Sequence, residues 1–302
     1  MDQSLLVFVT VAEKKNFSRA AEELHMTQPA VSQYIQTLER AIGAKLLERS
    51  NKFVRLNKAG EIVYHHAKEI LGIYTRMQCL VDDIMHTASG TLSIGASYTF
   101  GEYLLPHVIA YLHKEYPLIK PNITIANTKE IAEFVLAHQL DVGVVEGGLH
   151  QEKLYIEPFA EDRMYIVASA HHPYAQKKQL LPSDLSKETW IVREVGSGTR
   201  EATEKMFATL DFYPSNMMEF GSTQIIKESV EAGLGITLLS YWAIRKEIAT
   251  GSMMALNIEK LPITRQFSWV TQATPFHTKA TEVFLDVLRN NKNLPVFSEA
   301  EF

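Results

Sequence analysis

The sequence has few of the features that mark an exported or membrane protein. It has a single cysteine among 302 residues, Cys79, so no disulfide can form within the chain, as is usual in a reducing compartment. Its first residues, MDQSLLVFVTVAEKKNF, place an acid before a short apolar stretch that charged residues soon interrupt. This is the pattern of neither a signal peptide nor a membrane span. We therefore expect a cytoplasmic protein that does not bind membranes.

The sequence also lacks a large excess of either charge. Its 30 Lys and Arg residues against 35 Asp and Glu give a net charge of −5, which argues against a general nucleic-acid binder with a uniformly basic surface. Positive charge is concentrated locally, because the stretch 45–58 holds five basic residues against Glu48 alone. With 46% hydrophobic and 22% charged residues the chain is expected to fold, and its length predicts at least two folded units.

The first ninety residues have the apolar spacing of helices. Leu5, Phe8, Val9 and Ala12 recur at three-to-four-residue steps, which predicts a helix over about 3–14 with one buried face. A second, short helix is predicted over 19–24, with the Ser18 hydroxyl accepting a hydrogen bond from its first turn.

A third helix, predicted over 28–40, presents polar side chains on one face. Thr27 is the expected cap, and Pro29 is tolerated in a first turn. Val31, Ile35 and Leu38 form its apolar face. Together with the short helix before it, this segment predicts a helix-turn-helix whose second helix fits the DNA major groove. Periodicity alone leaves a small helical bundle with a solvated polar face equally open.

A basic hairpin is predicted after this pair of helices. Segments 46–47 and 53–56 flank 49–52 and indicate a short β-ribbon with a basic tip, that is, a wing. Amide and hydroxyl groups pair with base edges, whereas basic side chains meet phosphates or the minor groove. The candidate DNA-contacting residues are Arg19, Thr27, Gln28, Pro29, Ser32, Gln33, Gln36, Arg49, Lys52 and Arg55.

A long helix with a heptad seam is predicted over 58–88. Apolar residues alternate at steps of four and three along it, at Val63, Ala67, Ile70, Tyr74, Met77, Val81, Ile84 and Ala88. One seam of this length suits a two-stranded coiled coil or a helix lying against a partner. We therefore expect a homo-oligomer.

The remaining 210 or so residues alternate short β-rich segments with amphipathic helices, which predicts an α/β domain. Strands are expected near 92–94, 123–126, 142–145, 165–168, 190–192, 235–239 and 267–270. Helices are expected near 102–115, 129–139, 199–210, 223–233 and 277–290. Irregular connections near 146–162 and 258–266 are expected to cross between two lobes.

The amino-terminal segment FSRAAEELHMTQPAVSQYIQTLERAIGAKLLERSNKFVRLNKAGE resembles the signature of LysR-type transcriptional regulators. The similarity includes the FSRAAEELHMTQPAVS core, the IGAKLLER continuation and the closing AGE, and it covers about residues 1–65. The resemblance implies a winged helix-turn-helix, a linker helix that pairs two subunits, and a ligand domain like a periplasmic binding protein. It also implies base reading by the helix that begins at Gln28, a wing at 49–55, tetramers built as dimers of dimers, and contact with RNA polymerase.

The fold class is therefore α+β multidomain, in three parts. A winged helix-turn-helix is expected over 1–58 and a linker or dimerisation helix over 59–89. A two-lobed effector-binding domain is expected over 90–302, with one lobe at about 90–161 and 267–302 and the other at about 162–266.

The sequence REVGSGTR, residues 193–200, predicts an anion site, and the alternative is a tight turn at the glycines with Ser and Thr as plain caps. A strand there turns through two glycines into a helix, and unpaired amides at a helix amino terminus favour negative charge. Ser and Thr residues precede three other helices at strand ends, where open α/β sheets bind ligands, although each alone is more often a simple cap. The candidate effector-binding residues are Ser97, Tyr98, Thr99, Phe100, Thr128, Gly196, Ser197, Gly198, Thr199, Arg200, Ser222 and Thr223.

Other chemistry is not expected. The adjacent pairs 65–66 and 171–172 point their imidazoles in different directions and have no acidic cluster beside them, so we expect no metal site. Ser197 lies outside a nucleophile-elbow motif, so we expect neither catalysis nor a cofactor. Cys79 lies off the heptad seam, where a packed thiol is the ordinary role and a redox sensor the alternative.

These patterns predict a ligand-responsive transcription factor that binds a partly palindromic site in double-stranded DNA and senses a small anionic metabolite. We expect a homodimer or homotetramer. One alternative is a cytoplasmic two-lobed binding protein or enzyme with an accessory helical domain, although neither has an obvious use for the first 90 residues. A DNA-architectural protein without a ligand is the other, and the sensor-sized second domain argues against it.

Overall fold

The computed structural model describes residues 3–49, 53–85, 89–177, 179–274 and 276–290. The chain divides near residue 86 into two compact units, each with its own core. Within the described ranges, no helix combines the length and the apolar character needed to span a bilayer.

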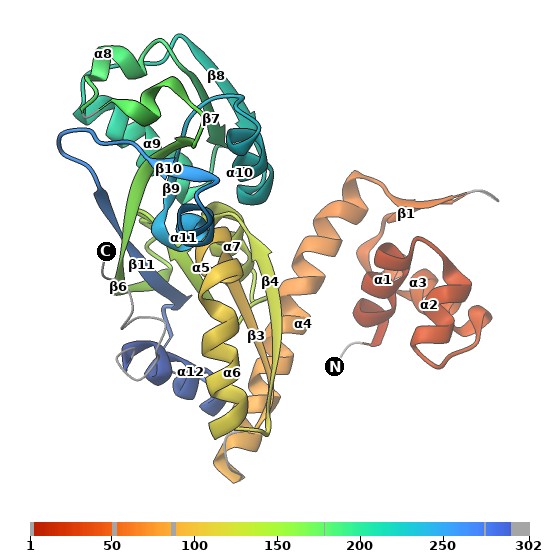
Figure 1. Cartoon of the computed structure of the whole chain (residues 1–302). Helices are drawn as coiled ribbons and strands as arrows, with labels where there is room; N and C mark the ends of the chain where they lie inside the picture. Colours follow the sequence, from red (N-terminus) through yellow and green to blue (C-terminus); the bar gives the residue numbers. More distant parts are fainter. Residues whose placement is uncertain (1–2, 50–52, 86–88, 178, 275, 291–302) are drawn as a thin grey trace. The chain divides into compact units, whose positions relative to one another are not determined.

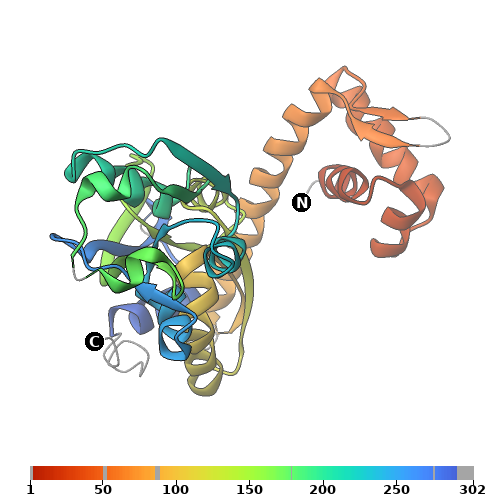
Figure 2. The same ribbon diagram turned by 45° about the horizontal axis from the view of Figure 1, so that its top comes forward.

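The first unit is a helix-turn-helix followed by a hairpin and a long helix (Figures 1 and 2). Its elements are α1 Gln3–Lys14, α2 Phe17–Glu23, α3 Gln28–Ile42, β1 Leu47–Arg49, β2 Val54–Leu56 and α4 Lys58–Met85. β1 and β2 are antiparallel, with Leu47 opposite Leu56. The predicted bounds of α1 and the Thr27 cap of α3 are confirmed, and α3 runs two residues beyond its predicted end, to the left-handed Gly43.

The predicted cap of the second helix is wrong. Asn16, not Ser18, precedes α2 in extended conformation, and its side-chain oxygen accepts a hydrogen bond from the Arg19 amide at 3.0 Å. The helix therefore begins at Phe17, two residues earlier than predicted. An asparagine carbonyl satisfies a first-turn amide as well as a serine hydroxyl does, so both positions were chemically suitable.

The heptad seam of α4 divides into two parts. At its amino-terminal end Val63 packs against the core of the unit, and Ala67 is buried. Further along, the seam residues Ile70, Met77 and Val81 are 52%, 51% and 58% exposed. Ile62 and Ile73 are exposed on the same side of the helix, so α4 carries an apolar stripe made of Ile62, Ile70, Ile73, Met77 and Val81. The predicted seam position Ala88 lies outside the described residues, as do the side chains of Ile84 and Cys79.

The second unit is built on a seven-stranded mixed sheet. Its order is β10, β6, β11, β5, β3 and β4, with β9 also paired to β6, and β7 and β8 form a separate parallel pair. The strands are β3 Gly90–Ser97, β4 Ile119–Ala126, β5 Val142–Glu146, β6 Leu154–Ser169, β7 Thr189–Arg193, β8 Asn216–Phe220, β9 Thr237–Ser240, β10 Met253–Ala255 and β11 Ile263–Gln272. The helices are α5 Tyr98–Tyr103, α6 Leu105–Glu115, α7 Thr128–Leu136, α8 Pro182–Leu185, α9 Gly198–Thr209, α10 Thr223–Glu231, α11 Tyr241–Thr250 and α12 Lys279–Arg289.

Two lobes share this sheet. Figure 1 shows β3, β4, α6 and α12 at one end of the unit and β7, β8, α8, α9 and α10 at the other. Each lobe has its own apolar core, one around Phe100, Phe267 and Phe284 and one around Trp190 and Phe207. We call these the first lobe (β3–β5, α5–α7 and α12) and the second lobe (β7–β10 and α8–α11).

The crossings between the lobes are strands, not the irregular connections predicted from the sequence. β6 is 16 residues long, and β11 pairs with it from Ile263 opposite Met164 to Gln272 opposite Leu154. The charged residues of 157–163 hid this strand from the sequence pattern. The described residues also include β8, β10, α8 and α11, which the sequence analysis did not predict.

Candidate functional sites

α3 presents a polar face to solvent. Thr27, Gln28, Pro29, Gln33 and Gln36 are exposed, and Ser32 is half-buried. The opposite face is buried through Val31, Ile35 and Leu38, as predicted. The Gln28 side-chain amide donates to the Ser32 hydroxyl at 3.0 Å, so these two groups are already paired in the free protein.

A buried carboxylate joins α3 to the hairpin. Glu39 is 4% exposed, and its two oxygens accept from the Lys45 ammonium at 2.8 Å and from the Leu46 amide at 3.0 Å. Burial alone would raise the pKa of Glu39, but these two hydrogen bonds hold it below its ordinary value. Glu39 was not among the predicted functional residues, although it stands just ahead of the basic stretch 45–58 and pairs with Lys45.

The predicted basic residues of the hairpin are engaged by acidic and aromatic neighbours. Arg55 pairs with Glu48 at 2.6 Å and lies over the Phe53 ring. Arg49 lies over the Phe17 ring, 5.6 Å from its centroid, and 3.8 Å from Glu39. Both side chains are exposed on the hairpin, as is Arg19 on α2. Lys52 lies outside the described residues.

In the second unit, the predicted hydroxyl residues precede or begin helices at the ends of strands. Ser97, Thr99, Thr128, Ser197, Thr199 and Thr223 are all buried, and Ser222 is half-buried ahead of α10. The amino terminus of α9 lies against the end of β5. The approach is so close that a Cβ on Gly198 would lie 2.1 Å from the Glu146 carbonyl oxygen. Glycine at this position therefore permits the two lobes to approach each other.

The hydroxyl groups fall into two sets by their hydrogen bonds. Ser97 donates to the Val144 carbonyl at 3.2 Å and Thr128 to the Glu146 carbonyl at 3.0 Å, so their hydrogens are engaged by the protein. Ser197 instead accepts from the Thr199 amide, and Thr199, Thr99 and Thr223 accept from arginine side chains. A hydroxyl that accepts keeps its hydrogen for another partner.

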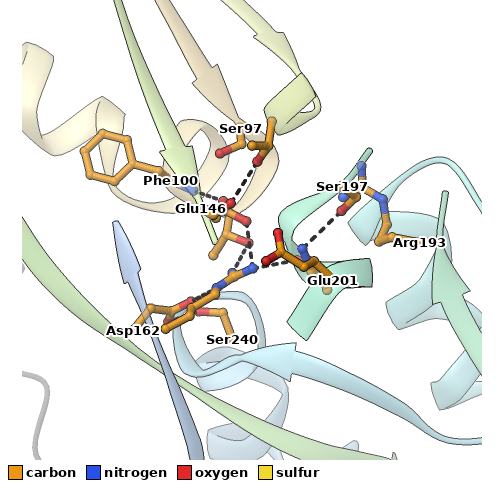
Figure 3. Close-up of polar contacts among 12 residues, drawn as sticks. Ser97, Phe100, Glu146, Asp162, Arg193, Ser197, Glu201 and Ser240 are labelled. Carbon is orange, nitrogen blue, oxygen red and sulfur yellow. Dashed lines mark hydrogen bonds and ion pairs between the residues drawn. The ribbon is translucent and has the colours of Figure 1, made fainter. Parts of the chain in front are cut away.

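Arg265 lies between Thr99 and Thr199 and pairs with two buried carboxylates. Its Nη1 is 2.9 Å from Glu146, and its Nε donates to Asp162 at 2.7 Å. Figure 3 shows Glu146 and Asp162 on opposite sides of these contacts, with Ser240 beside Asp162. Burial raises the pKa of Asp162 to about 6. Arg265 opposes this shift, and the nearby Glu146 carboxylate, which shares the same guanidinium, adds to it.

Arg193 is a second buried cation in this unit. Its guanidinium lies 4.2 Å from the centroid of the half-buried Tyr98 ring and donates to Thr223 at 3.1 Å and to both oxygens of Glu194. The sequence analysis included Arg193 only as the start of its motif.

Three other predicted effector residues make contacts within the protein. Phe100 is fully buried in the first-lobe core, in edge contact with Phe159 and Phe267, and only its amide faces Glu146. Arg200 bonds Glu204, Glu219 and the Arg193 carbonyl. Gly196 takes a positive φ of 96°, which suits glycine, and its carbonyl accepts from the Lys129 amide at 3.2 Å.

A groove of about 430 Å³ lies beside this cluster, between α7, the loop 148–151 and the start of α9. Thr128, Gly196, Ser197 and Arg200 line it, together with apolar residues such as Leu149 and Val195. Four of the predicted effector residues therefore line one side of this groove. The prediction missed Glu146, which follows the predicted strand 142–145, and Asp162 and Arg265, which lie in the crossings that were predicted to be irregular. No cluster able to hold a metal is present among the described residues.

Two family models match the chain. A model of the "Bacterial regulatory helix-turn-helix protein, lysR family" matches residues 3–61, and one of the "LysR substrate binding domain" matches residues 86–293. The HTH-type transcriptional regulator CysL of Bacillus subtilis (strain 168) is 37% identical over 287 residues, which cover 95% of this chain and 96% of CysL.

Solved structures agree with this fold. The regulatory domain of CcmR from Synechocystis PCC6803, in complex with 2-PG, is similar with 27% identity and a TM-score of 0.63 over 68% of this chain and 98% of that one. Full-length CbnR complexed with its target DNA is similar with 20% identity and a TM-score of 0.72, covering 96% of this chain and 99% of CbnR.

Proposed function

Because the chain belongs to the LysR family of transcriptional regulators, we propose that α3 and the β1–β2 hairpin bind operator DNA and that the cleft between the lobes binds a small anionic effector. The observation that carries the first part is the polar face of α3, where Gln28, Gln33 and Gln36 are exposed opposite a buried apolar face. Amide side chains of this kind read base edges in the major groove.

The proposed DNA contacts are those of the sequence analysis, with Arg19, Arg49, Lys52 and Arg55 on the phosphates or in the minor groove. The experiment selects bound fragments from the host genome and measures the affinity of Gln36→Ala for the selected site and for scrambled DNA. We expect affinity for the site to fall about tenfold and the preference over scrambled DNA to fall with it. Gln224→Ala, an exposed glutamine on α10, is the matched control and should change neither. Unchanged preference in Gln36→Ala would rule out base reading by this residue.

The proposed effector site lies at the amino terminus of α9 and the groove beside it. Ser197, Thr199, Thr99 and Thr223 carry hydrogens that no described group accepts, and the half-buried Gly196 lines the groove. These donors suit the oxygen atoms of a carboxylate, sulfate or phosphate. The CcmR domain bound to 2-PG, at 27% identity, supports a small ligand in this type of domain.

A binding titration of sulfate, phosphate and 2-phosphoglycolate tests the effector site. At least one anion is expected to bind the wild type and to bind Thr199→Ala about tenfold more weakly, since one donor is lost. Thr209→Ala, at the far end of the same helix, is the control, because its hydroxyl donates to the Lys205 carbonyl on the surface. Equal affinity in wild type and Thr199→Ala would contradict the assignment.

The domain limits and the assembly belong to this proposal as well. The winged helix-turn-helix would occupy 1–58, the linker helix 59–89 and the effector domain 90–302. The exposed stripe of α4 supports a homo-oligomer, because five apolar side chains along one helix face favour burial against a second copy. A dimer or tetramer, a partly palindromic operator and contact with RNA polymerase complete the proposal.

A further inference from the structure

Arg265 contacts both lobes at the same time. It stands on β11, directly opposite Asp162 in the ladder with β6, so it belongs to the crossing strands. Its Nη2 donates to Thr99 of the first lobe at 3.0 Å, and its Nη1 donates to Thr199 of the second lobe at 3.0 Å. One planar guanidinium therefore holds the first turns of α5 and α9 at a fixed separation.

Every partner of this guanidinium is buried. Glu146, Asp162, Thr99 and Thr199 are each 3% exposed or less, and Arg265 itself is 7% exposed. Moving the lobes apart would break at least one of the two threonine bonds and leave an unpaired N–H in a low-dielectric site. That change is more costly than breaking a solvated surface contact.

The carboxylates of Glu146 and Asp162 hold the Arg265 guanidinium in place. The second oxygen of Glu146 accepts from the Phe100 amide at 3.1 Å, and the second oxygen of Asp162 accepts from the Ser240 hydroxyl at 2.6 Å. The guanidinium cannot turn without breaking these ion pairs, so its two threonine-directed N–H groups have constant directions. Each threonine oxygen accepts from Arg265, and its own hydrogen must point elsewhere.

We propose that Arg265 is a positioning residue that joins the lobes through Thr99 and Thr199 and sets both hydroxyls as hydrogen-bond donors. The joining of the lobes does not depend on a ligand. The second part rests on the proposed effector site, since donors from both lobes would favour a ligand that offers several acceptor oxygens and would disfavour one that offers none.

Lysine is the informative replacement. Arg265→Lys keeps the positive charge beside Glu146 and Asp162, but a single ammonium cannot reproduce the planar fork that reaches two threonines. Arg163→Lys, on an exposed neighbouring position of β6, makes the same chemical change without affecting the lobes. Thr199→Val removes the acceptor on the α9 side alone and nearly preserves the volume of the side chain.

Hydrogen exchange of the full-length protein without ligand tests the joining of the lobes. Amides of 99–104 and 199–203 are expected to exchange about tenfold faster in Arg265→Lys and in Thr199→Val, with no change in Arg163→Lys. The double variant Arg265→Lys, Thr199→Val is expected to exchange little faster than the single variants, because both changes remove the same Arg265–Thr199 hydrogen bond. Unchanged exchange in both single variants, or fully additive effects, would overturn the proposal. If Arg265→Lys does not fold, Thr99→Val and Thr199→Val give the same test.

Titration with sulfate, phosphate and 2-phosphoglycolate then tests the donor role. Thr99→Val and Thr199→Val are expected to weaken binding of the anion that the wild type binds by similar factors, and Arg265→Lys at least as much. Faster exchange combined with unaltered anion affinity would refute the donor role and leave the joining of the lobes intact. If the wild type binds none of these anions, the proposed effector class fails, and the exchange result still decides whether Arg265 joins the lobes.

Discussion

Glu146, Asp162 and Arg265 form a buried charged cluster in the described part of the second unit. Asp162 is fully buried, and its counter-charge, Arg265, is shared with Glu146. Desolvation disfavours the ionised carboxylate more than this shared arginine and the Ser240 hydroxyl favour it. Asp162 therefore takes up a proton close to pH 6, above the ordinary range of an aspartate.

This proton uptake predicts the pH dependence of stability. The pKa of Asp162 is raised from 3.8 in the unfolded chain to about 6, so between these values the folded state holds a proton that the unfolded state has lost. Stability from this group is therefore present at low pH and decreases as pH rises through 4 to 6. Relative to Asp162→Asn, we expect the wild type to lose about 2 kcal/mol between pH 4.5 and pH 7.

Urea unfolding followed by tryptophan fluorescence measures this difference, because Trp190, Trp242 and Trp269 all lie in the second unit. Glu161→Gln, the exposed neighbour of Asp162, is the control and should follow the wild type at every pH. A constant difference between wild type and Asp162→Asn across this range would show that Asp162 does not titrate there.

At the scale of elements, α4 carries an exposed apolar stripe. Its exposed stripe continues the heptad seam past the point where Val63 and Ala67 are covered within the first unit. Replacing both Ile73 and Met77 by Asp would place two charges in the proposed interface, where burial without partners is unfavourable. We expect the association constant of the oligomer to fall at least tenfold, whereas the helix content stays unchanged.

Sedimentation equilibrium of the full-length protein measures this change. The control is Leu181→Asp, since Leu181 is 62% exposed just before α8 and far in sequence from the stripe. A double variant Ile73→Asp, Met77→Asp that associates as tightly as the control would exclude the stripe from the interface.

The elements that the sequence predicted well are those whose own period determines their burial. α1 and α3 have apolar residues at helical spacing, and their bounds were close to those found. β6 was missed over most of its length because Glu157, Glu161 and Asp162 break the apolar pattern, and the arginine partners of Glu157 and Asp162 lie on other elements. α11 and β8 likewise lack a strong period of their own, and tertiary packing decides their conformation.

The candidate sites show the same division. Strand-end hydroxyls can be found from local sequence, because a Ser or Thr before a helix has a local meaning. Arg265 has no such signal, since its partners are 103 residues away at Asp162, 66 at Thr199 and 166 at Thr99. Which hydroxyls keep a free hydrogen also depends on these distant donors. No local sequence pattern contains that information.

For the whole molecule, the expected output is linkage between two binding events. A ligand that favours one lobe arrangement changes DNA affinity only if the oligomer that presents two copies of α3 differs between the arrangements. The acidic balance of the whole chain, −5, opposes DNA at long range. Binding must therefore depend on local phosphate contacts by the few exposed basic residues of the first unit.

This dependence predicts how affinity varies with salt. Arg19 is exposed on α2, and no ionic or side-chain hydrogen-bonding partner of its guanidinium is found among the described residues. Removing it in Arg19→Ala should weaken binding to specific and scrambled DNA alike and reduce the slope of log K against log salt by about one per subunit, since each phosphate contact releases about one counterion. Lys246→Ala, exposed on α11, removes the same charge from the other unit and should leave the slope unchanged. Anisotropy titrations between roughly 50 and 300 mM salt measure both slopes. If Arg19→Ala keeps the wild-type slope, α2 makes no phosphate contact through this residue, whereas a loss confined to the specific site would instead make Arg19 a base-reading residue.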